Sequence, residues 1–315
     1  MSFQAKEPIL IVGLGGAGSR LALQARDHLG ADVLLISNDQ KDLHTEDSIT
    51  VSTAPVINPS VQLIRGSAYK IQEEIRAKIS CYSTIIIMAN LAGKAGAALA
   101  PIVSQICKDE GIEAMSFAIM PFKYEKNRIF SSGIALKRLR EYCRCTIVLD
   151  NDALLESNPS LSPKTCHDIA NKTILHVIDS LKTSEINLET GILATGTKSH
   201  DIEESLRDAL KMLYDDAPPD SIKHCILYVV GENIPVGVLS SIADITSGVL
   251  KGGDSQVNLE SIHSDESNVI MLSTVQGMTK FDSYDPLGII PQERTLDWSQ
   301  PECSIDCKID LVQLE

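Results

Sequence analysis

The decisive stretch of this chain is Ile9-Leu-Ile-Val-Gly-Leu-Gly-Gly-Ala-Gly-Ser19. Apolar residues run directly into a cluster of glycines, and residues 20–26 then have the composition of a helix. The pattern predicts a buried strand, a tight turn and a helix whose first N–H groups are free. Glycines let a ligand approach the backbone, and free N–H groups at a helix N-terminus attract anions. The stretch therefore predicts a phosphate-binding loop for a nucleotide or dinucleotide.

Length and charge exclude several classes of protein. The 315 residues are 43% hydrophobic and carry a formal net charge of −14, with 4% aromatic residues. So acidic a chain has no broad basic surface for phosphates, and we expect no nucleic-acid partner. No apolar run approaches the roughly 20 residues that span a bilayer, so we expect no direct membrane insertion. The N-terminus does not resemble a secretory leader, which predicts a cytoplasmic protein.

The eight cysteines predict reduced thiols rather than a disulfide framework. No two of them have CxxC spacing, and several lie inside apolar runs. This usage is typical of proteins from a reducing compartment. Cys303 and Cys307 are the exception, because together they could bind a metal or oxidise. Two ligands do not make a zinc site, and we predict no metal centre.

Strand and helix patterns alternate through the first half of the chain. We expect strands at 8–13, 32–37, 84–89, 113–119 and 145–150, and helices at 18–28, 64–79, 95–110 and 132–142. This alternation predicts an α/β fold with a doubly wound, mainly parallel sheet. A long helix over 162–182 follows, since Ser162 suits an N-cap and Pro163 the first helical position.

The second half predicts a smaller α+β domain. Strands are expected at 192–196, 225–230 and 268–274, and helices at 201–214 and 235–250. Residues 285–315 are acidic and contain several prolines, which indicates an irregular tail. We therefore divide the chain into a nucleotide-binding domain (1–161), a central connecting helix (162–183), a C-terminal α+β domain (184–284) and the acidic tail (285–315).

The loops that follow the strands supply the candidate phosphate-binding residues, because ligands of such folds lie beyond the carboxyl ends of the strands. Asp39 follows the second strand and can hold a ribose hydroxyl. Residues 89–101 form a second small-residue loop that leads into a helix, and Lys94 adds positive charge there. Two such loops predict a phosphate chain gripped from both sides. The alternative is an alanine-rich helix start selected for close packing.

Later loops supply candidates for the sugar and the base. Glu125 can accept from ribose hydroxyls, and Arg128 can reach a phosphate or sugar. Asn151 and Asn171 each offer a donor and an acceptor, which suits the edge of a purine. The predicted nucleotide-binding residues are Gly13, Gly15, Gly16, Gly18, Ser19, Arg20, Asp39, Gly93, Lys94, Gly96, Glu125, Arg128, Asn151 and Asn171.

Taken in order over about residues 8–280, these segments resemble the tubulin/FtsZ superfamily. The opening loop is similar to the first phosphate loop of FtsZ. Further similarities are at Ile36–Leu43 (second loop), Asn58–Val61 (third loop), Pro121–Glu125 with Arg128 (proline-phenylalanine-glutamate loop), Asn151-Asp152 (base-contacting loop), 162–182 (central helix) and Gly191–Thr197 (first C-terminal strand).

The resemblance implies a function and a set of partners. It implies a guanine-nucleotide-binding cytoskeletal protein that takes GTP or GDP, with or without Mg²⁺. It also implies filaments in cell division or cell shape, formed by head-to-tail self-association or with an FtsZ-family partner. In the family, acidic residues after the central helix enter the neighbouring subunit's pocket and position the attacking water.

The chain departs from the family at two places that bear on hydrolysis. The family's glycine-rich signature loop carries two threonines where this chain has Ala95 and Ala97, and each lost hydroxyl donor costs roughly 1–3 kcal/mol. Arg20 stands where the family has a smaller polar residue. Compared with the family, the acidic catalytic loop is deleted, which leaves Glu185 and Glu189 as the catalytic candidates. We therefore expect weak or absent GTP hydrolysis.

Two alternatives remain open at this point. The first is a nucleotide-independent, degenerate scaffold that keeps the fold and pairs with another protein, since a fold does not imply an activity. The second is a Rossmann-type NAD- or ATP-dependent enzyme, because the same glycine pattern opens those proteins as well.

Overall fold

The computed structural model describes residues 3–45, 47–181, 190–196, 202–232, 234–250, 256–262 and 267–285. The predicted catalytic candidates Glu185 and Glu189 lie outside the described residues, as do Cys303, Cys307 and the tail beyond residue 285. The six cysteines within the described residues are free thiols, and all but Cys81 are buried. Within the same ranges, no helix is both long and apolar enough to cross a bilayer.

One sheet of ten strands runs through the molecule, in the order β3-β2-β1-β4-β5-β6-β7-β10-β8-β9. The strands are β1 (Ile9–Leu14), β2 (Asp32–Ser37), β3 (Ser48–Thr50), β4 (Thr84–Asn90), β5 (Glu113–Met120), β6 (Cys145–Asp150), β7 (Thr190–Thr195), β8 (Ile222–Val230), β9 (Gln256–Ile262) and β10 (Asn268–Val275). All neighbours from β3 to β7 are parallel, whereas β10 runs antiparallel to β7 and β8. This confirms the predicted α/β fold with a mainly parallel sheet.

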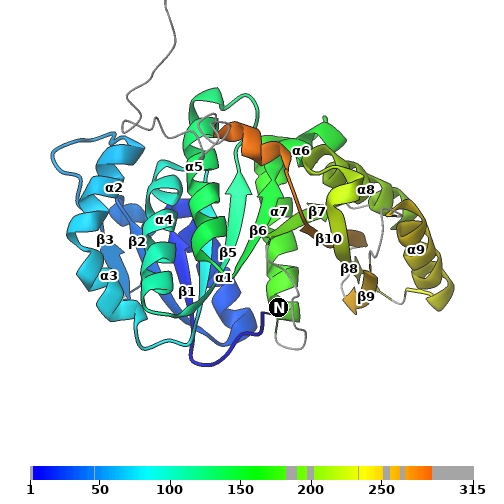
Figure 1. Cartoon of the computed structure of the whole chain (residues 1–315), viewed down its shortest axis with the longest axis horizontal. Helices are drawn as coiled ribbons and strands as arrows, with labels where there is room; N and C mark the ends of the chain where they lie inside the picture. The colour runs from blue at the N-terminus through cyan, green and yellow to red at the C-terminus, as the bar shows by residue number, and fades with distance from the viewer. Residues whose placement is uncertain are drawn as a thin grey trace, which may run out of the picture.

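Nine α-helices and three short 3₁₀ segments lie in the described ranges. They are α1 (Gly15–Leu29), α2 (Val61–Lys70), α3 (Gln72–Ile79), α4 (Lys94–Asp109), α5 (Lys126–Tyr142), α6 (Asn151–Ser157), α7 (Pro163–Ser180), α8 (Ile202–Asp216), α9 (Val236–Val249), η1 (Gln40–Asp42), η2 (Pro219–Ser221) and η3 (Lys280–Tyr284). Helix α4 packs against α2 and α5, and α1 packs against α7. Figure 1 shows α2 and α3 at one end of the sheet and α9 at the other.

Two local expectations were wrong, and three elements were missed. The helix predicted over 64–79 is two helices, because Ile71 leaves the helical path with φ −112° and ψ 16°. Helix α5 begins at Lys126 rather than at 132, since Glu125 acts as its N-cap residue. Strands β3 and β9 and helix α6 were not predicted. Strand β3 has only three residues and α6 only seven, which is too short for a periodic pattern to be recognised in the sequence.

The central strands form the core because helices cover the sheet. Residues Ile85–Met88 of β4 are fully buried, which explains why the strand is a continuous apolar run rather than an alternating one. The sheet also continues from the first half of the chain into the second, since Thr146–Val148 of β6 pair with Thr190–Ile192 of β7. The division into domains at 161 and 184 stays a prediction.

Helix α7 begins where the sequence indicates. The Ser162 side chain accepts a hydrogen bond from the Thr165 backbone N–H at 3.1 Å, and Pro163 occupies the first helical turn. The helix ends at Ser180. It carries His167, Asp168 and Asn171 past the carboxyl ends of the strands, where one of the cavities described below opens.

Candidate functional site

The first glycine loop joins β1 directly to α1. Gly15 has a φ of +67°, a left-handed conformation that is strained for any residue with a side chain. A Cβ there would also lie 2.8 Å from the Ala95 Cβ. A Cβ on Gly16 would lie 2.5 Å from an Asp42 carboxylate oxygen. Leu14 precedes α1 without a side-chain cap, and no acidic residue lies in the first turn. The N-terminus of α1 therefore keeps free N–H donors.

Two other glycines of the motif serve packing. A Cβ on Gly18 would lie 2.3 Å from the Met88 carbonyl oxygen of β4, and one on Gly13 would lie 2.8 Å from the Ala22 Cβ. These glycines bring α1 against β1 and β4. Ser19 is 1% exposed, and its Oγ has no hydrogen-bond partner in the described part of the chain. None of the three lines either of the two cavities described next.

The second small-residue loop faces the first at the N-terminus of α4. Gly93 precedes the helix without a side-chain cap, and Lys94 is its first residue. A Cβ on Gly96 would lie 2.2 Å from the Asn90 carbonyl oxygen, so this glycine lets α4 approach the end of β4. Ala97 is buried at 1% exposure. Close packing thus accounts for Gly96 and Ala97, whereas Lys94 projects from the fold.

A cavity of about 380 Å³ lies between the two loops and is called here the phosphate-side cavity. Two basic side chains line it. The Lys94 Nζ donates to the Asn58 Oδ1 at 2.7 Å, whereas the Arg128 Nη1 pairs with the Glu125 carboxylate at 2.7 Å. Two helix N-termini and an ammonium around one hollow favour an anionic ligand.

A second cavity of about 500 Å³ adjoins the first, because Ala17 and Asn90 line both. We call it the α7-side cavity. Helix α7 contributes the groups Lys164, His167, Asp168 and Asn171, and Arg20 comes from α1. These side chains include one aromatic ring and several donors and acceptors, which suits a heterocyclic base.

Asn151 lies behind this cavity rather than in its wall. It is 1% exposed, and its Nδ2 donates to the Met120 carbonyl oxygen at 3.2 Å and lies 3.4 Å from the His167 Nδ1. Its Oδ1 is buried without a hydrogen-bond partner among the described residues. The Phe122 ring meets His167 edge-on, with centroids 5.5 Å apart. Asn151 and Phe122 therefore hold the His167 ring in place.

The predicted residues thus fall into three groups. Gly15, Gly16, Asp39, Gly93, Lys94, Gly96 and Arg128 line the phosphate-side cavity; Arg20 and Asn171 line the α7-side cavity; Gly13, Gly18, Ser19, Glu125 and Asn151 line neither. Glu125 pairs with Arg128 and accepts from the Phe122 N–H at 3.2 Å. Whether any of these residues binds a nucleotide stays a prediction.

Sequence reasoning missed Asn58 and His167 as lining residues. His167 lies one helical turn before Asn171, so the i, i+4 spacing on a helix could have indicated it. Asn58 was assigned only to a loop of the resemblance, and its contact with Lys94 spans 36 residues of sequence. No local pattern indicates such a contact.

A cluster of charged side chains, of which Asp150 and Asp216 are fully buried, lies apart from both cavities, where β6, α8 and η3 meet. The Lys280 ammonium contacts Asp150 and Asp215 and lies 2.9 Å from the Asp216 Oδ1. The three carboxylates form the only group of metal-ligating side chains found within the described residues. The Lys280 ammonium lies among these carboxylates and supplies the positive charge that they face, and the absence of a metal centre stays a prediction.

Burial sets the protonation of this cluster. Burial raises the pKa of Asp216 well above its ordinary value, and the neighbouring Asp150 raises it further. Burial also raises the pKa of Asp150, which Lys280 partly offsets. Burial alone would lower the pKa of Lys280, but the surrounding carboxylates raise it. The carboxylates therefore keep Lys280 charged at neutral pH, and Asp216 is the carboxyl whose pKa lies well above its ordinary value.

Asp216→Asn is expected to flatten the pH dependence of stability. A folded-state pKa above the unfolded value stabilises the fold at low pH, and this contribution is lost as the pH rises through the folded pKa. The variant should therefore gain stability relative to wild type from pH 5 upward, by at most about 1.4 kcal/mol per pH unit. Urea unfolding from pH 5 to 8.5 measures the difference; parallel profiles for the two proteins would contradict the assignment.

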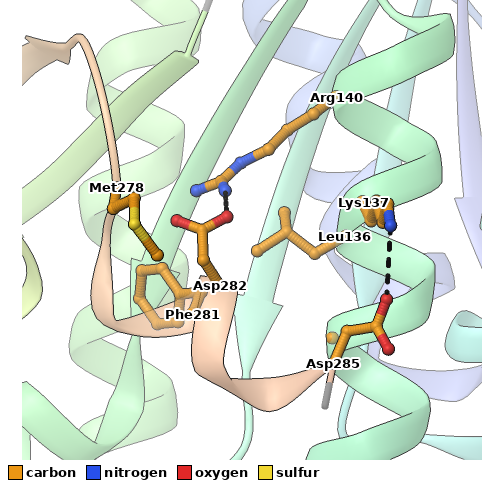
Figure 2. A pocket seen from close by; sticks show the side chains of 8 residues that line it. Leu136, Lys137, Arg140, Met278, Phe281, Asp282 and Asp285 are labelled. Carbon is orange, nitrogen blue, oxygen red and sulfur yellow. Dashed lines mark hydrogen bonds and ion pairs between the residues drawn. The ribbon is translucent and has the colours of Figure 1, made fainter. Parts of the chain in front are cut away.

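A third cavity, of about 480 Å³, lies between α5 and η3. Figure 2 shows Leu136, Phe281 and Met278 along it and two ion pairs across it. The Arg140–Asp282 pair spans 3.1 Å and the Lys137–Asp285 pair 3.5 Å. It shares no lining residue with the other two cavities, and each of its cations already faces a carboxylate.

Known proteins match the chain in both sequence and fold. A model of the tubulin/FtsZ family, GTPase domain, matches residues 61–159. Cell division protein FtsZ 1 of Methanocaldococcus jannaschii is 25% identical, and the alignment covers 82% of this chain and 81% of the relative. FtsZ 1 of Pyrococcus woesei is 23% identical, with coverage of 99% and 91%.

Solved structures share the architecture. An empty FtsZ dimer of M. jannaschii superposes with a TM-score of 0.69 at 20% identity, covering 86% of this chain and 88% of that one. CetZ2 of Haloferax volcanii, described as a GTPγS-bound protofilament, has a TM-score of 0.65 at 16% identity, with coverage of 88% and 96%. The sheet and its helices thus define a tubulin/FtsZ-type α/β fold. The chain is similar to the tubulin/FtsZ family in sequence and shares its fold.

Proposed function

We propose that this chain binds a guanine nucleotide across the two adjoining cavities. The observation that carries the proposal is their junction at Ala17 and Asn90, which joins a hollow between two helix N-termini to one lined by α7. The first suits a phosphate chain and the second a base. GTP or GDP is the proposed ligand, because the family is described by its GTPase domain.

Mg²⁺ fits this site as a companion of the nucleotide. The ion takes one or two carboxylates and fills its remaining positions with phosphate oxygens and water. Asp39 lines the phosphate-side cavity, and its Oδ1 accepts from the Lys41 N–H at 3.0 Å, which leaves the other oxygen available. We therefore propose that Asp39 is the carboxylate of this chain that would bind the Mg²⁺.

We further propose that any GTP hydrolysis is slow. Ala95 and Ala97 replace hydroxyl residues of the family's signature loop. The sequence between α7 and β7 carries Glu185 and Glu189 in place of the family's acidic pattern, and a carboxylate must lie within about 3 Å of the water to activate it. These differences support nucleotide binding with weak or absent turnover.

We propose that the chain acts in a cytoplasmic filament that serves cell division or cell shape. It would enter the filament by head-to-tail self-association or by pairing with an FtsZ-family protein. Helix α9 supports it, because Val236 is 79% exposed, Val249 is 43% exposed and Asp244 is the only charged residue of the helix. Ile57, beside the phosphate-side cavity, is 99% exposed. Apolar residues left in water at two places favour burial against a partner.

Titration calorimetry of the wild-type chain with GTP, GDP and ATP tests the binding proposal. We expect both guanine nucleotides to bind more tightly than ATP. His167→Ala should weaken GTP about tenfold, because loss of ring stacking on a base costs on the order of 1–3 kcal/mol. Inorganic tripolyphosphate is the control ligand, and its affinity should not change in this variant. No guanine-nucleotide binding at millimolar concentration would refute the proposal.

The nucleotide-independent scaffold is the second candidate. It is favoured by the role of Gly96 and Ala97, which pack α4 closely without requiring a ligand. Light scattering with and without GTP separates the two candidates, because a scaffold associates to the same extent in both conditions. The similarity to the tubulin/FtsZ family favours these two candidates over the Rossmann-type enzyme.

A further inference from the structure

We propose that Lys94 is the cation that binds the nucleotide's phosphates, and that Asn58 competes with the phosphates for it. This inference rests on the proposed nucleotide binding. Lys94 and Asn58 come from different segments, both line the phosphate-side cavity, and they meet through a 2.7 Å hydrogen bond from the Nζ to the Oδ1. The ammonium therefore has an internal partner that carries no charge.

The position of Lys94 is not explained by the stability of α4. Lys94 is the first residue of the helix, where the positive end of the helix dipole disfavours a cation. No acidic residue lies in the first turn to offset that charge, and Gly93 provides no side-chain cap. An anion between the ammonium and the helix N-terminus would interact favourably with both.

The two basic side chains of the cavity differ in their partners. Arg128 is paired with the Glu125 carboxylate at 2.7 Å, and a phosphate must compete with that charge. Lys94 contacts only the neutral Asn58 amide among the side chains described, with no carboxylate within 4.0 Å. A charged acceptor forms the stronger hydrogen bond with an ammonium, so a phosphate displaces Asn58 more readily than it displaces Glu125.

The exchange has a direct thermodynamic consequence. Binding of a phosphate breaks the Lys94–Asn58 hydrogen bond and forms a charge-assisted one, so the first bond subtracts from the affinity for the ligand. Removal of Asn58 should strengthen binding, and removal of the Lys94 charge should weaken it. If the pair were only structural, both substitutions would remove the same contact between the two segments and weaken binding together.

The test measures GTP and inorganic tripolyphosphate affinities by calorimetry for wild type, Asn58→Ala and Lys94→Gln. Asn58→Ala should bind both ligands about 2- to 10-fold more tightly, the equivalent of one neutral hydrogen bond. Lys94→Gln should bind both about 10- to 100-fold more weakly, and its affinity should depend less steeply on salt because one cation is missing. Lys41→Gln, an exposed lysine on η1 that does not line the cavity, is the charge control.

Each outcome decides between the two proposals. Weaker binding in Asn58→Ala, or unchanged binding in Lys94→Gln, overturns the competition while leaving nucleotide binding intact. If wild type binds tripolyphosphate but not GTP, the proposed function fails and the variants still test Lys94 on tripolyphosphate. Binding of neither ligand at millimolar concentration refutes both. Thermal melting of each variant shows whether a loss of affinity reflects unfolding.

Discussion

Lys280→Met is expected to lower the free energy of unfolding by about 3–5 kcal/mol, the usual cost of removing one partner from a buried ion pair. Lys280 contacts three carboxylates, and the Asp150 and Asp216 side chains are fully buried. Without the ammonium, these carboxylates would repel each other in a medium that screens them poorly. Methionine keeps much of the side-chain volume, so lost packing contributes little to the effect.

Urea unfolding followed by circular dichroism at pH 7 measures this loss. Lys211→Met on α8 is the control, since Lys211 is exposed and its replacement should change stability by less than about 0.5 kcal/mol. A loss below about 1 kcal/mol in Lys280→Met would contradict the central role of the ammonium. The carboxylates would then have to be neutralised by their own protons.

Nothing in the sequence around Lys280 indicates this cluster. The lysine lies in a short 3₁₀ segment, and Asp150, Asp215 and Asp216 come from the end of a strand and the end of a helix. Each of these residues is polar at the end of an element, where exposed polar residues are ordinary. The burial of Asp150 and Asp216 results from the packing of β6, α8 and η3, which is a property of the tertiary structure.

The phosphate-side cavity shows the opposite case. Gly15 and Gly16 could be placed from sequence, because the strand, the turn and the helix that position them are consecutive in the chain. The 89–101 loop could be placed beside them for a similar reason: it follows a strand of the same parallel sheet, and the loops after parallel strands meet at the carboxyl edge of the sheet. Asn58 and the ring of His167 could not be placed in this way, since their roles depend on side-chain directions across the cavities.

The same glycine motif also shows that a sequence pattern can attribute to ligand binding residues that are needed for packing. Gly13 and Gly18 belong to the motif that indicates phosphate binding, yet the atoms closest to them belong to α1 and β4. A glycine is required equally by a close ligand and by a close neighbour within the fold. Sequence alone does not distinguish these causes, whereas the position of a hypothetical Cβ does.

Gly18→Ala is expected to destabilise the chain by about 3 kcal/mol, at the upper end of the usual cost of overpacking. The added Cβ would lie 2.3 Å from the Met88 carbonyl oxygen and 3.2 Å from its carbonyl carbon, and both are backbone atoms of a buried strand. Relief requires α1 to move away from β4. Because α1 also carries Gly15 and Gly16, the same shift should weaken GTP binding in the fraction that remains folded.

Gly66→Ala is the matched control and should change stability in the opposite direction. Gly66 lies on the exposed face of α2, and a Cβ there would meet no atom within 4 Å. The same change of one methyl group should therefore stabilise the chain by about 0.5–1 kcal/mol, because alanine favours the helix over glycine. Urea unfolding of the two variants compares them directly. Equal effects would mean that helix propensity, and not the contact between α1 and β4, explains the glycine at position 18.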